Sequence, residues 1–324
     1  MKPAIQFGTD GWRALIGDGF TTANLRVVAQ AFADWIMRAR GRRARVLIGY
    51  DGRFGGERFA LAAARVLAGN GLRTDVTAEP VPTPALSWWI LRRRYDGGLM
   101  ITASHNPPAY SGVKVKPHFG GSPDETVIGA LVAALGRRPP RDGGAVRRVT
   151  FTPAYDAMIR SLVDLRALRR LRGTVVHDPM GGVQLGRLDA VLRGLPLRIV
   201  RIHDRLDPMF CGLDAPEPVE KNLRELMEAV PRHRALLGIA TDGDGDRVGI
   251  VSNDGTTLSP HLIYALLLLF MIRERKLTGG VVKTVSGSFL LDRIARAHGL
   301  ELHETPVGFK HICRLMREDD ILMG

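Results

Sequence analysis

The sequence predicts an α/β fold made of consecutive α/β/α layered domains with mixed sheets. The first observation is that short apolar runs typical of strands alternate with longer segments whose apolar residues recur at helical spacing. The second is the length of 324 residues, enough for two or three domains that each have a core. The third is that chemistry-bearing residues follow strand-like runs, at the ends where α/β sheets present functional loops.

The first part of the chain carries helix and strand signals at short intervals. Thr21 or Thr22 starts a helical pattern that continues to Arg40, because a threonine hydroxyl can accept hydrogen bonds from the free N–H groups of a first turn. Glycine, proline and asparagine residues separate the elements that follow. These are strand 46–50, helix 57–68, strand 74–77, helix 85–94, strand 99–101 and strand 113–116.

Residues 136–148, GRRPPRDGGAVRR, contain few apolar side chains and predict a linker. With this linker, the alternation of elements predicts a domain boundary near residue 145. The elements predicted after it are helix 153–168, strands 174–177 and 197–202, strands 236–241 and 248–251, helix 262–272, strand 281–285, helix 289–298 and strand 301–304.

The charge balance favours a small anionic substrate over a nucleic acid. The 46 Lys and Arg residues exceed the 33 Asp and Glu residues, which gives a net charge of +13. The arginines fall in separate clusters without interleaved aromatic residues, and no DNA-binding motif is present, so we expect no nucleic-acid partner. Attraction of a phosphorylated small molecule explains the charge more simply.

The sequence gives no reason to expect a disulfide framework, a zinc site or a membrane segment. Cys211 and Cys313 stand far apart in no metal-type spacing, which favours a reducing cytoplasm. The N-terminal segment lacks the apolar core of a signal peptide. The most apolar run, residues 262–272, is too short to cross a bilayer, so we expect no membrane insertion.

A serine follows a strand-like run within GGLMITASHNPPAYSGVKVK, residues 97–116. The asparagine and two prolines after it cannot continue a strand ladder, so the chain turns and presents Ser104 on a loop. The alternation at residues 113–116 then predicts a strand that brings the ammonium group of Lys114 back towards the hydroxyl. From these residues alone, a plain turn without chemistry is the alternative.

Three carboxylates alternate with glycines between two apolar runs, in the stretch TDGDGDR. Asp242, Asp244 and Asp246 converge in such a loop and repel one another unless a cation neutralises them, and oxygen ligands indicate Mg²⁺ or a similar hard ion. A calcium EF-hand is excluded, because Arg247 and Asn253 occupy the positions that need Gly and Glu. A phosphatase with an aspartate nucleophile and a plain acidic turn stay open.

These segments together resemble the α-D-phosphohexomutases, the phosphoglucomutase and phosphomannomutase family. TASHNP is similar to the family's phosphoserine loop and DGDGDR to its metal loop, and FGTDGWR, GYDGR, PTP and PEP match further family segments. The resemblance implies that residues 1–145 form domain I with the phosphoserine loop. Residues 146–255 would form domain II with the metal-binding loop, and residues 256–324 the N-terminal part of domain III.

The resemblance also implies roles for individual residues. Ser104 would carry the phosphoryl group, with Arg13 facing it and Arg247 supporting the phosphate. Lys283 and Lys310 match family motifs near the substrate. The implied Mg²⁺ ligands are Ser104, Asp242, Asp244 and Asp246.

The function that follows is that of a phosphohexose mutase, an isomerase of cytoplasmic carbohydrate metabolism. It would interconvert hexose 1-phosphate and hexose 6-phosphate, of glucose or mannose, through a phosphoserine and a hexose 1,6-bisphosphate that also serves as activator. Positioning and cations do most of the catalysis in such transfers. Lys114 is the candidate for moving the hydroxyl proton, because a lysine among cations can have its pKa lowered, and His105 competes for this role.

The resemblance ends before the family's sugar-reading loop and its fourth domain. We therefore expect a C-terminally truncated chain with an incomplete third domain and an absent fourth, which leaves open an inactive fragment that binds sugar phosphate. A Mg²⁺-dependent sugar phosphatase is a further alternative. The residues do not determine the oligomeric state or the preferred hexose, although FGTDGWR and SHNPP lean towards the phosphoglucomutase branch.

Overall fold

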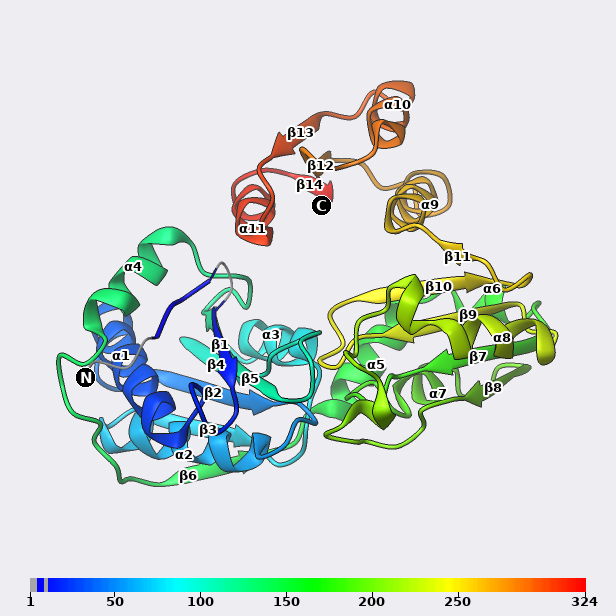
Figure 1. The fold of residues 1–324 in the computed structure, drawn as a ribbon. Coiled ribbons are helices and arrows are strands. Elements are labelled where there is room, and N and C mark those ends of the chain that lie inside the picture. Colours follow the sequence, from blue (N-terminus) through cyan, green and yellow to red (C-terminus); the bar gives the residue numbers. More distant parts are fainter. Residues whose placement is uncertain (1–4, 9–10) are drawn as a thin grey trace. The chain divides into compact units, whose positions relative to one another are not determined.

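The computed structural model describes residues 5–8 and 11–324. The chain forms two compact units (Figure 1). The first unit covers residues 1–257 apart from the short segment 121–124, which belongs with residues 258–324 in the second unit.

A six-stranded mixed sheet forms the centre of the N-terminal half of the first unit. Its strand order is β1-β5-β4-β2-β3-β6. Four neighbouring strands, β4, β2, β3 and β6, run parallel, whereas β5 is antiparallel to both β4 and β1. The strands are β1 (Gly11–Leu15), β2 (Arg45–Tyr50), β3 (Arg73–Thr77), β4 (Gly97–Ile101), β5 (Tyr110–Pro117) and β6 (Val146–Val149).

Alternate side chains of the inner strands enter two different cores, as expected for a sheet covered on both faces. From β2, Val46 and Ile48 enter one core, while Leu47 enters the other together with Met100 of β4. Thr21 caps the first helix by accepting a hydrogen bond from the Asn24 N–H, as predicted. The helices over the first core are α1 (Thr22–Arg40), α2 (Gly56–Gly69) and α4 (Glu125–Ala134), and those over the second are α3 (Thr83–Arg92) and α5 (Thr152–Leu162).

The segment predicted as a linker packs against the helices of the first sheet. The Arg141 N–H donates to Gln30 Oε1 (3.1 Å), and the Gly143 N–H donates to the Arg65 carbonyl (3.3 Å). Gly69 permits this crossing, because a Cβ there would lie 2.2 Å from the Arg141 carbonyl oxygen. The segment then enters β6, so the first sheet contains a strand beyond residue 145. The domain limits at residues 145 and 255 stay predictions.

A five-stranded sheet in the order β11-β10-β9-β7-β8 forms the other half of the first unit. Strands β8, β7 and β9 run parallel, and β10 returns antiparallel to β9. The apolar face of α8 joins these strands in one core. The elements are β7 (Gly173–Asp178), α7 (Arg187–Leu192), β8 (Leu197–Arg201), α8 (Arg224–Arg232), β9 (Leu237–Thr241), β10 (Val248–Ser252) and β11 (Thr257–Leu258), with 3₁₀ turns at Phe210–Gly212 and Glu220–Asn222.

The continuous helix predicted at residues 153–168 is wrong, because the structure breaks it in two. Helix α5 ends at Leu162, and α6 (Leu165–Leu168) begins after Asp164. The Asp164 carboxylate accepts hydrogen bonds from the N–H groups of Arg166 and Ala167, both at 3.0 Å. Such a local cap satisfies N–H groups that would otherwise pair within a continuous helix, so it competes with helix propagation.

The second unit is built on a parallel three-stranded sheet in the order β13-β12-β14. Its core joins α9 and α10 to β12 through Leu268, Leu291 and Val281. Ser259 caps α9 by accepting a hydrogen bond from the Leu262 N–H. The elements are α9 (Pro260–Arg273), β12 (Gly280–Thr284), α10 (Phe289–Ala297), β13 (Leu302–Thr305), α11 (Phe309–Glu318) and β14 (Ile321–Met323).

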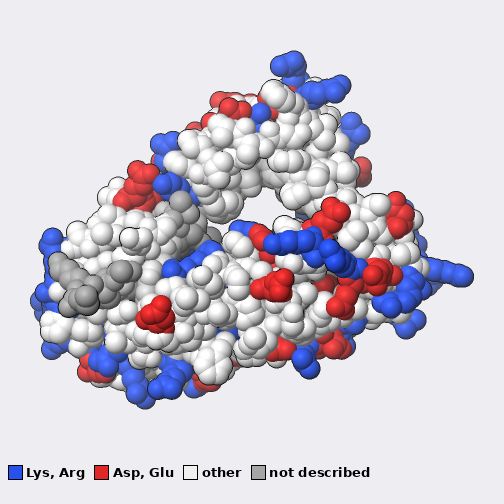
Figure 2. Space-filling model, in the orientation of Figure 1, with Lys and Arg blue, Asp and Glu red and all other residues white. Residues whose placement is uncertain are grey.

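The surface and the helices carry two general features. On the face drawn in Figure 2, Lys and Arg side chains are dispersed among Asp and Glu side chains instead of gathering in one patch. None of the helices in the described part of the chain has the length and apolar character needed to span a bilayer.

Candidate active site

Two loops that connect antiparallel strands meet in the first unit. The serine loop, residues 102–109, joins β4 to β5, and the aspartate loop, residues 242–247, joins β9 to β10. The Ser104 hydroxyl donates a hydrogen bond to Asp242 Oδ2 at 3.0 Å, across 138 residues of sequence. The two loops singled out in the sequence therefore form one polar centre.

Ser104 is buried and has a left-handed backbone, with φ of +52°. Few residues other than glycine adopt this conformation, and they keep it only where neighbouring contacts stabilise it. The Ser104 N–H donates to Thr102 Oγ1 (2.8 Å), and the Ser104 carbonyl accepts from Arg53 (2.7 Å). This conformation directs the hydroxyl to Asp242.

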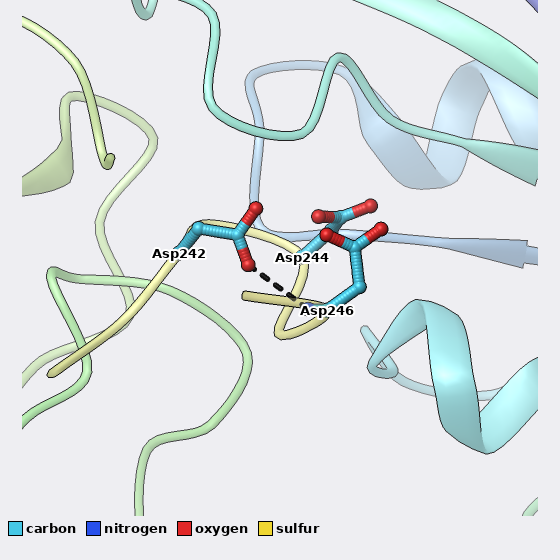
Figure 3. A group of neighbouring side chains, drawn as sticks. All are labelled: Asp242, Asp244 and Asp246. Carbon is cyan, nitrogen blue, oxygen red and sulfur yellow. Dashed lines mark hydrogen bonds between the residues drawn. The ribbon is translucent and has the colours of Figure 1, made fainter. Parts of the chain in front are cut away.

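The aspartate loop brings three carboxylates together (Figure 3). One oxygen atom from each of Asp242, Asp244 and Asp246 lies within 4.8 Å of the other two. The N–H groups of Asp246 and Arg247 donate to Asp242 Oδ1 at 2.9 and 3.0 Å, which closes the turn. The convergence expected from the spacing of these aspartates is thus present in the structure.

Two glycines make the loop compact enough to approach the serine loop. Gly245 has a φ of +72°, a conformation that side chains with a Cβ disfavour. A Cβ on Gly243 would lie 3.0 Å from the Ser104 carbonyl oxygen and equally close to Phe210 and Pro216. A side chain at position 243 would therefore crowd both the serine loop and these two residues.

Asp242 and Asp244 are both completely buried, yet their pKa values shift in opposite directions. Burial, followed by the charges of Asp244 and Asp246, raises the pKa of Asp242 well above its ordinary range. Burial also acts to raise the pKa of Asp244, but the Lys114 ammonium and the hydrogen bonds from Lys114 and Thr83 outweigh it and lower that pKa. Asp244 is therefore an anion at neutral pH, whereas burial and two neighbouring carboxylates disfavour the charged form of Asp242.

The N-terminal half of the unit supplies the groups that bind Asp244. Lys114 of β5 places Nζ 2.8 Å from Asp244 Oδ2 and 2.7 Å from Asp246 Oδ2. Thr83, the first residue of α3, donates its hydroxyl to Asp244 Oδ2 (2.6 Å) and its N–H to the Asp244 carbonyl (2.9 Å). The Lys114 ammonium and the Thr83 hydroxyl, both from the N-terminal half of the unit, thus position carboxylates of the aspartate loop.

The carboxylate cluster fits a hard divalent cation. Two unit charges about 4 Å apart repel by about 4 kcal/mol in surroundings with an effective dielectric constant near 20. Within residues 5–8 and 11–324, no group donates a hydrogen bond to the buried Asp244 Oδ1, which leaves it available as a ligand. Oxygen donors of this kind suit Mg²⁺. The groups that would bind it are the carboxylates of Asp242, Asp244 and Asp246 and the oxygen of Ser104.

Arg13 lies in β1 beside the serine loop. Its Nη1 donates a hydrogen bond to the Asn106 side chain at 2.7 Å, which ties Arg13 to the loop that carries Ser104. Thr9 and Asp10, which precede Arg13 in the segment FGTDGWR, lie outside the described residues. The role of Arg13 towards the phosphoserine stays a prediction.

His105 and Arg247 meet at Glu217. Arg247 Nη1 donates to Glu217 Oε1 at 2.8 Å, and His105 Nε2 lies 4.0 Å from the same oxygen. Burial, and then the charge of Arg247, lowers the pKa of His105. The lowered pKa favours the neutral imidazole form of His105, which can accept a proton. Its Nδ1 is buried and makes no hydrogen bond to any residue that the structure describes.

The other two predicted substrate residues belong to the second unit. Lys283 of β12 pairs with Asp292 (2.7 Å) and Glu304 (3.1 Å), and hydrogen bonds to these two carboxylates raise the pKa of Lys283. Lys310 lies in the first turn of α11. Their roles towards a substrate stay predictions.

Three contributors to the site were not predicted as such from the sequence. They are Arg53, Thr83 and Glu217, which lie in the segments GYDGR, PTP and PEP. These segments match the family, but the contacts of their side chains reach residues 51, 161 and 30 positions away. No local pattern encodes such contacts, so only the matching segments themselves signalled that these residues matter.

Comparison with known proteins places all three parts of the chain in one family. Models of the phosphoglucomutase/phosphomannomutase family match its alpha/beta/alpha domain I at residues 4–138, domain II at residues 153–255 and domain III at residues 259–324. The α/β class predicted from the sequence, with layered domains and mixed sheets, is confirmed.

Relatives and solved structures agree with these models. The chain is 31% identical to a phosphoglucomutase/phosphomannomutase of Thermococcus kodakarensis, over 98% of this chain and 70% of the relative. It is 34% identical to a phosphoglucosamine mutase of Paenarthrobacter aurescens, over the same shares of 98% and 70%. A structure from Thermus thermophilus, assigned as a phosphomannomutase, has a TM-score of 0.94 at 35% identity, covering 100% of this chain and 74% of that one. The chain belongs to the phosphoglucomutase/phosphomannomutase family.

Proposed function

We propose that this protein is a phosphohexose mutase that interconverts hexose 1-phosphates and hexose 6-phosphates through phosphorylated Ser104. The observation that supports it most strongly is the hydrogen bond of 3.0 Å from the Ser104 hydroxyl to Asp242, inside a cluster of carboxylates. Transfer through a serine requires this apposition of hydroxyl and carboxylates. A phosphatase with an aspartate nucleophile has no need of it.

The reaction consists of two phosphoryl transfers of opposite direction. In the first, the bond between phosphorus and Ser104 Oγ breaks, a bond to a hydroxyl oxygen of the hexose monophosphate forms, and the hydroxyl proton passes to a base. The resulting hexose 1,6-bisphosphate then turns over in the site. The bond between its other phosphorus and the sugar oxygen breaks as a new bond to Ser104 Oγ forms, and the released sugar oxygen takes up a proton to give the isomer. Bound Mg²⁺ supplies positive charge that stabilises the transferring group.

Lys114 and His105 are the proposed proton-handling residues. Lys114 forms ion pairs with two aspartates, and its ammonium group is proposed to stabilise negative charge and to return a proton. The lowered pKa of His105 leaves a neutral imidazole that can accept the proton of the attacking hydroxyl. Arg13 and Arg247 are proposed to contribute positive charge to the phosphate, because guanidinium groups donate paired hydrogen bonds to its oxygens.

Glucose and mannose phosphates are the proposed substrates, with hexose 1,6-bisphosphate as activator. Relatives of similar identity include a phosphoglucomutase/phosphomannomutase and a phosphoglucosamine mutase, so glucosamine phosphates belong in the same assay. Lys283 and Lys310 are proposed to contact the substrate. The free thiols of Cys211 and Cys313 suit the cytoplasm, where we propose that the enzyme works.

A coupled assay tests the proposal. It contains glucose 1-phosphate, a trace of glucose 1,6-bisphosphate and Mg²⁺, with free phosphate measured in parallel and Ser104→Ala as the control. We expect glucose 6-phosphate to form with Ser104 present and not with Ser104→Ala. Free phosphate released independently of Ser104 would establish a phosphatase instead, and absence of turnover from folded protein would establish an inactive sugar-phosphate-binding chain.

A further inference from the structure

Arg53 lies in the turn that follows β2, and its side chain is completely buried, with 0% of its surface exposed. Burying a guanidinium group away from water is costly unless acceptors satisfy its N–H groups and its charge. The groups that bind the Arg53 guanidinium therefore show which segment of the chain it stabilises.

The terminal nitrogens of Arg53 bind four backbone carbonyls of one segment. Nη2 donates to the carbonyls of Ser104 (2.7 Å) and Asn106 (2.6 Å). Nη1 donates to the carbonyls of Pro107 and Tyr110, both at 2.9 Å. Four carbonyl oxygens directed at a common centre repel one another and need hydrogen-bond donors there, and one buried guanidinium supplies them together with a positive charge.

Two further groups fix the guanidinium itself. Asp51 Oδ2 lies 3.3 Å from Nε, and the Arg53 N–H donates to Asp51 Oδ1 at 3.0 Å. The Phe210 ring, which comes from the half of the unit that carries the aspartate loop, has its centroid 4.8 Å from Arg53 Cζ. A guanidinium over an aromatic face is favourable, more so when both are shielded from water. Arg53 is thus fixed by groups from both halves of the unit.

We propose that Arg53 is a positioning residue for phosphoryl transfer. By binding four carbonyls between Ser104 and Tyr110, it stabilises the left-handed conformation of Ser104 and so places the hydroxyl 3.0 Å from Asp242. The inference rests on the proposed function of Ser104. The four bonds of the guanidinium all end on backbone carbonyls, so Arg53 acts through the loop backbone.

The chemistry of arginine is specific for this task. Its planar guanidinium carries five N–H donors in a fixed fork, whereas lysine offers three donors from a single point. Arg53→Lys therefore keeps the positive charge but cannot bind four separate carbonyls. Arg53→Ala leaves a space that free guanidinium ion can occupy, which provides a chemical rescue.

The experiment compares wild type, Arg53→Lys, Arg53→Ala and Arg53→Ala with added guanidinium. Hydrogen exchange of peptides covering residues 103–111 reports the order of the loop without any catalysis. Phosphorylation of Ser104 by glucose 1,6-bisphosphate with Mg²⁺, followed by peptide mass spectrometry, reports its function. Leu67→Ala, a buried core substitution in α2, serves as the control for a general loss of stability.

We expect faster exchange in residues 103–111 for both Arg53 variants and unchanged exchange there for Leu67→Ala. We expect Ser104 phosphorylation to slow by about 100-fold, because misplacement of a reacting group by about 1 Å costs that much. Guanidinium is expected to restore protection and part of the rate in Arg53→Ala, and to have no such effect on Arg53→Lys.

Two results would overturn the inference. Wild-type protection of residues 103–111 in Arg53→Lys would show that the four hydrogen bonds do not order the loop. Ser104 phosphorylation at the wild-type rate in Arg53→Ala would show that positioning does not depend on them. A wild-type protein that is not phosphorylated at Ser104 refutes the proposed function, and the exchange measurement alone then decides whether Arg53 orders the loop.

Discussion

The serine loop and the aspartate loop are both turns between antiparallel strands, but they are stabilised in opposite ways. In the serine loop, the backbone carbonyls point inward and a buried guanidinium, that of Arg53, satisfies them. In the aspartate loop, the inward groups are carboxylates, and the Lys114 ammonium satisfies two of them. Both cations come from the N-terminal half of the first unit.

This difference gives Arg53 a geometric role and Lys114 an electrostatic role. Arg53 binds neutral carbonyls, so its effect is on the shape of the loop and on the direction of the Ser104 hydroxyl. Lys114 binds anions, so its effect is on the charge state of Asp244 and on the competition for any metal ion at the cluster.

The largest effect is expected for Lys114→Met. Removal of the ammonium leaves the buried Asp244 carboxylate without its ion pair, which costs about 3–5 kcal/mol of unfolding free energy in metal-free protein. Loss of a proton-handling group lowers turnover by about 10²–10⁴-fold. Urea unfolding in EDTA and the coupled assay measure the two effects.

The same substitution is expected to strengthen Mg²⁺ binding, because the ammonium no longer competes for Asp244 and Asp246. Isothermal titration with Mg²⁺ checks this, and Mg²⁺ should recover part of the lost stability by binding only the folded state. Lys116→Met, two residues along the same strand, is the control, since no ion pair of Lys116 is present in the part of the chain that the structure describes. Equal Mg²⁺ affinity in wild type and Lys114→Met would contradict the electrostatic role.

Two buried groups, one in each half of the first unit, are expected to affect stability in opposite directions as pH changes. Burial lowers the pKa of His177 in β7 to about 4, so the unfolded chain binds a proton that the folded chain rejects, and stability falls as pH drops from 6.5 to about 4. Burial raises the pKa of Asp51 from 3.8 to about 6, so stability present at low pH is lost as pH rises through this range. Each shift corresponds to about 3 kcal/mol.

Urea unfolding of His177→Gln and Asp51→Asn between pH 4 and pH 8 tests these two slopes. We expect His177→Gln to flatten the fall in stability towards acid. Asp51→Asn should remove the opposite fall between pH 4 and pH 6. Unaltered pH profiles in both variants would show that these two groups titrate alike in the folded and unfolded chains.

A smaller effect is expected for Thr83→Val, which keeps the shape but removes the hydrogen bond of 2.6 Å to the Asp244 carboxylate. A hydrogen bond to a charged group contributes about 1.5–3 kcal/mol, so urea unfolding should show a loss of this size. Thr77→Val is the matched control, because the buried Thr77 hydroxyl has no partner among the residues described and its removal should not destabilise. Equal losses in both variants would mean that the hydroxyl of Thr83 has no specific role.

The smallest effect is expected for Glu217→Gln. Its pair with Arg247 is partly exposed, and such pairs contribute at most about 1 kcal/mol to stability. The charge of Glu217 acts to raise the pKa of His105, so its removal should lower that pKa further. Titration of His105 by NMR measures the direction, and an increase would contradict the assigned geometry.

Local elements were predictable where local forces determine them. Helix α1 has the predicted limits, because the Thr21 cap and the helical recurrence of Leu25, Val28, Phe32 and Ile36 agree. The single helix predicted at residues 153–168 was wrong because Asp164 caps a new helix and interrupts it. A capping residue within a helical pattern does not change the spacing of the apolar residues, so that spacing does not reveal the break.

The site was predictable as two loops but not as a set of contacts. Residue type and spacing indicate the Ser104 hydroxyl and the carboxylates of the aspartate loop as candidate site groups. Their apposition spans 138 residues, and the four bonds from Arg53 end on backbone carbonyls, which every residue possesses and no sequence pattern marks. The resemblance to the family predicted that the serine loop and the aspartate loop meet. Only the structure shows which side chains hold the two loops in place.

The two loops are proposed to form one Mg²⁺-dependent centre for phosphoryl transfer to Ser104. The most direct measurement is site-specific phosphorylation by glucose 1,6-bisphosphate, mapped by mass spectrometry in wild type, Ser104→Ala and Asp244→Asn, with Mg²⁺ or with EDTA. The account predicts phosphate on Ser104 only in wild type with Mg²⁺. Phosphate on another residue, or on Ser104 at an equal rate in Asp244→Asn or in EDTA, would contradict it.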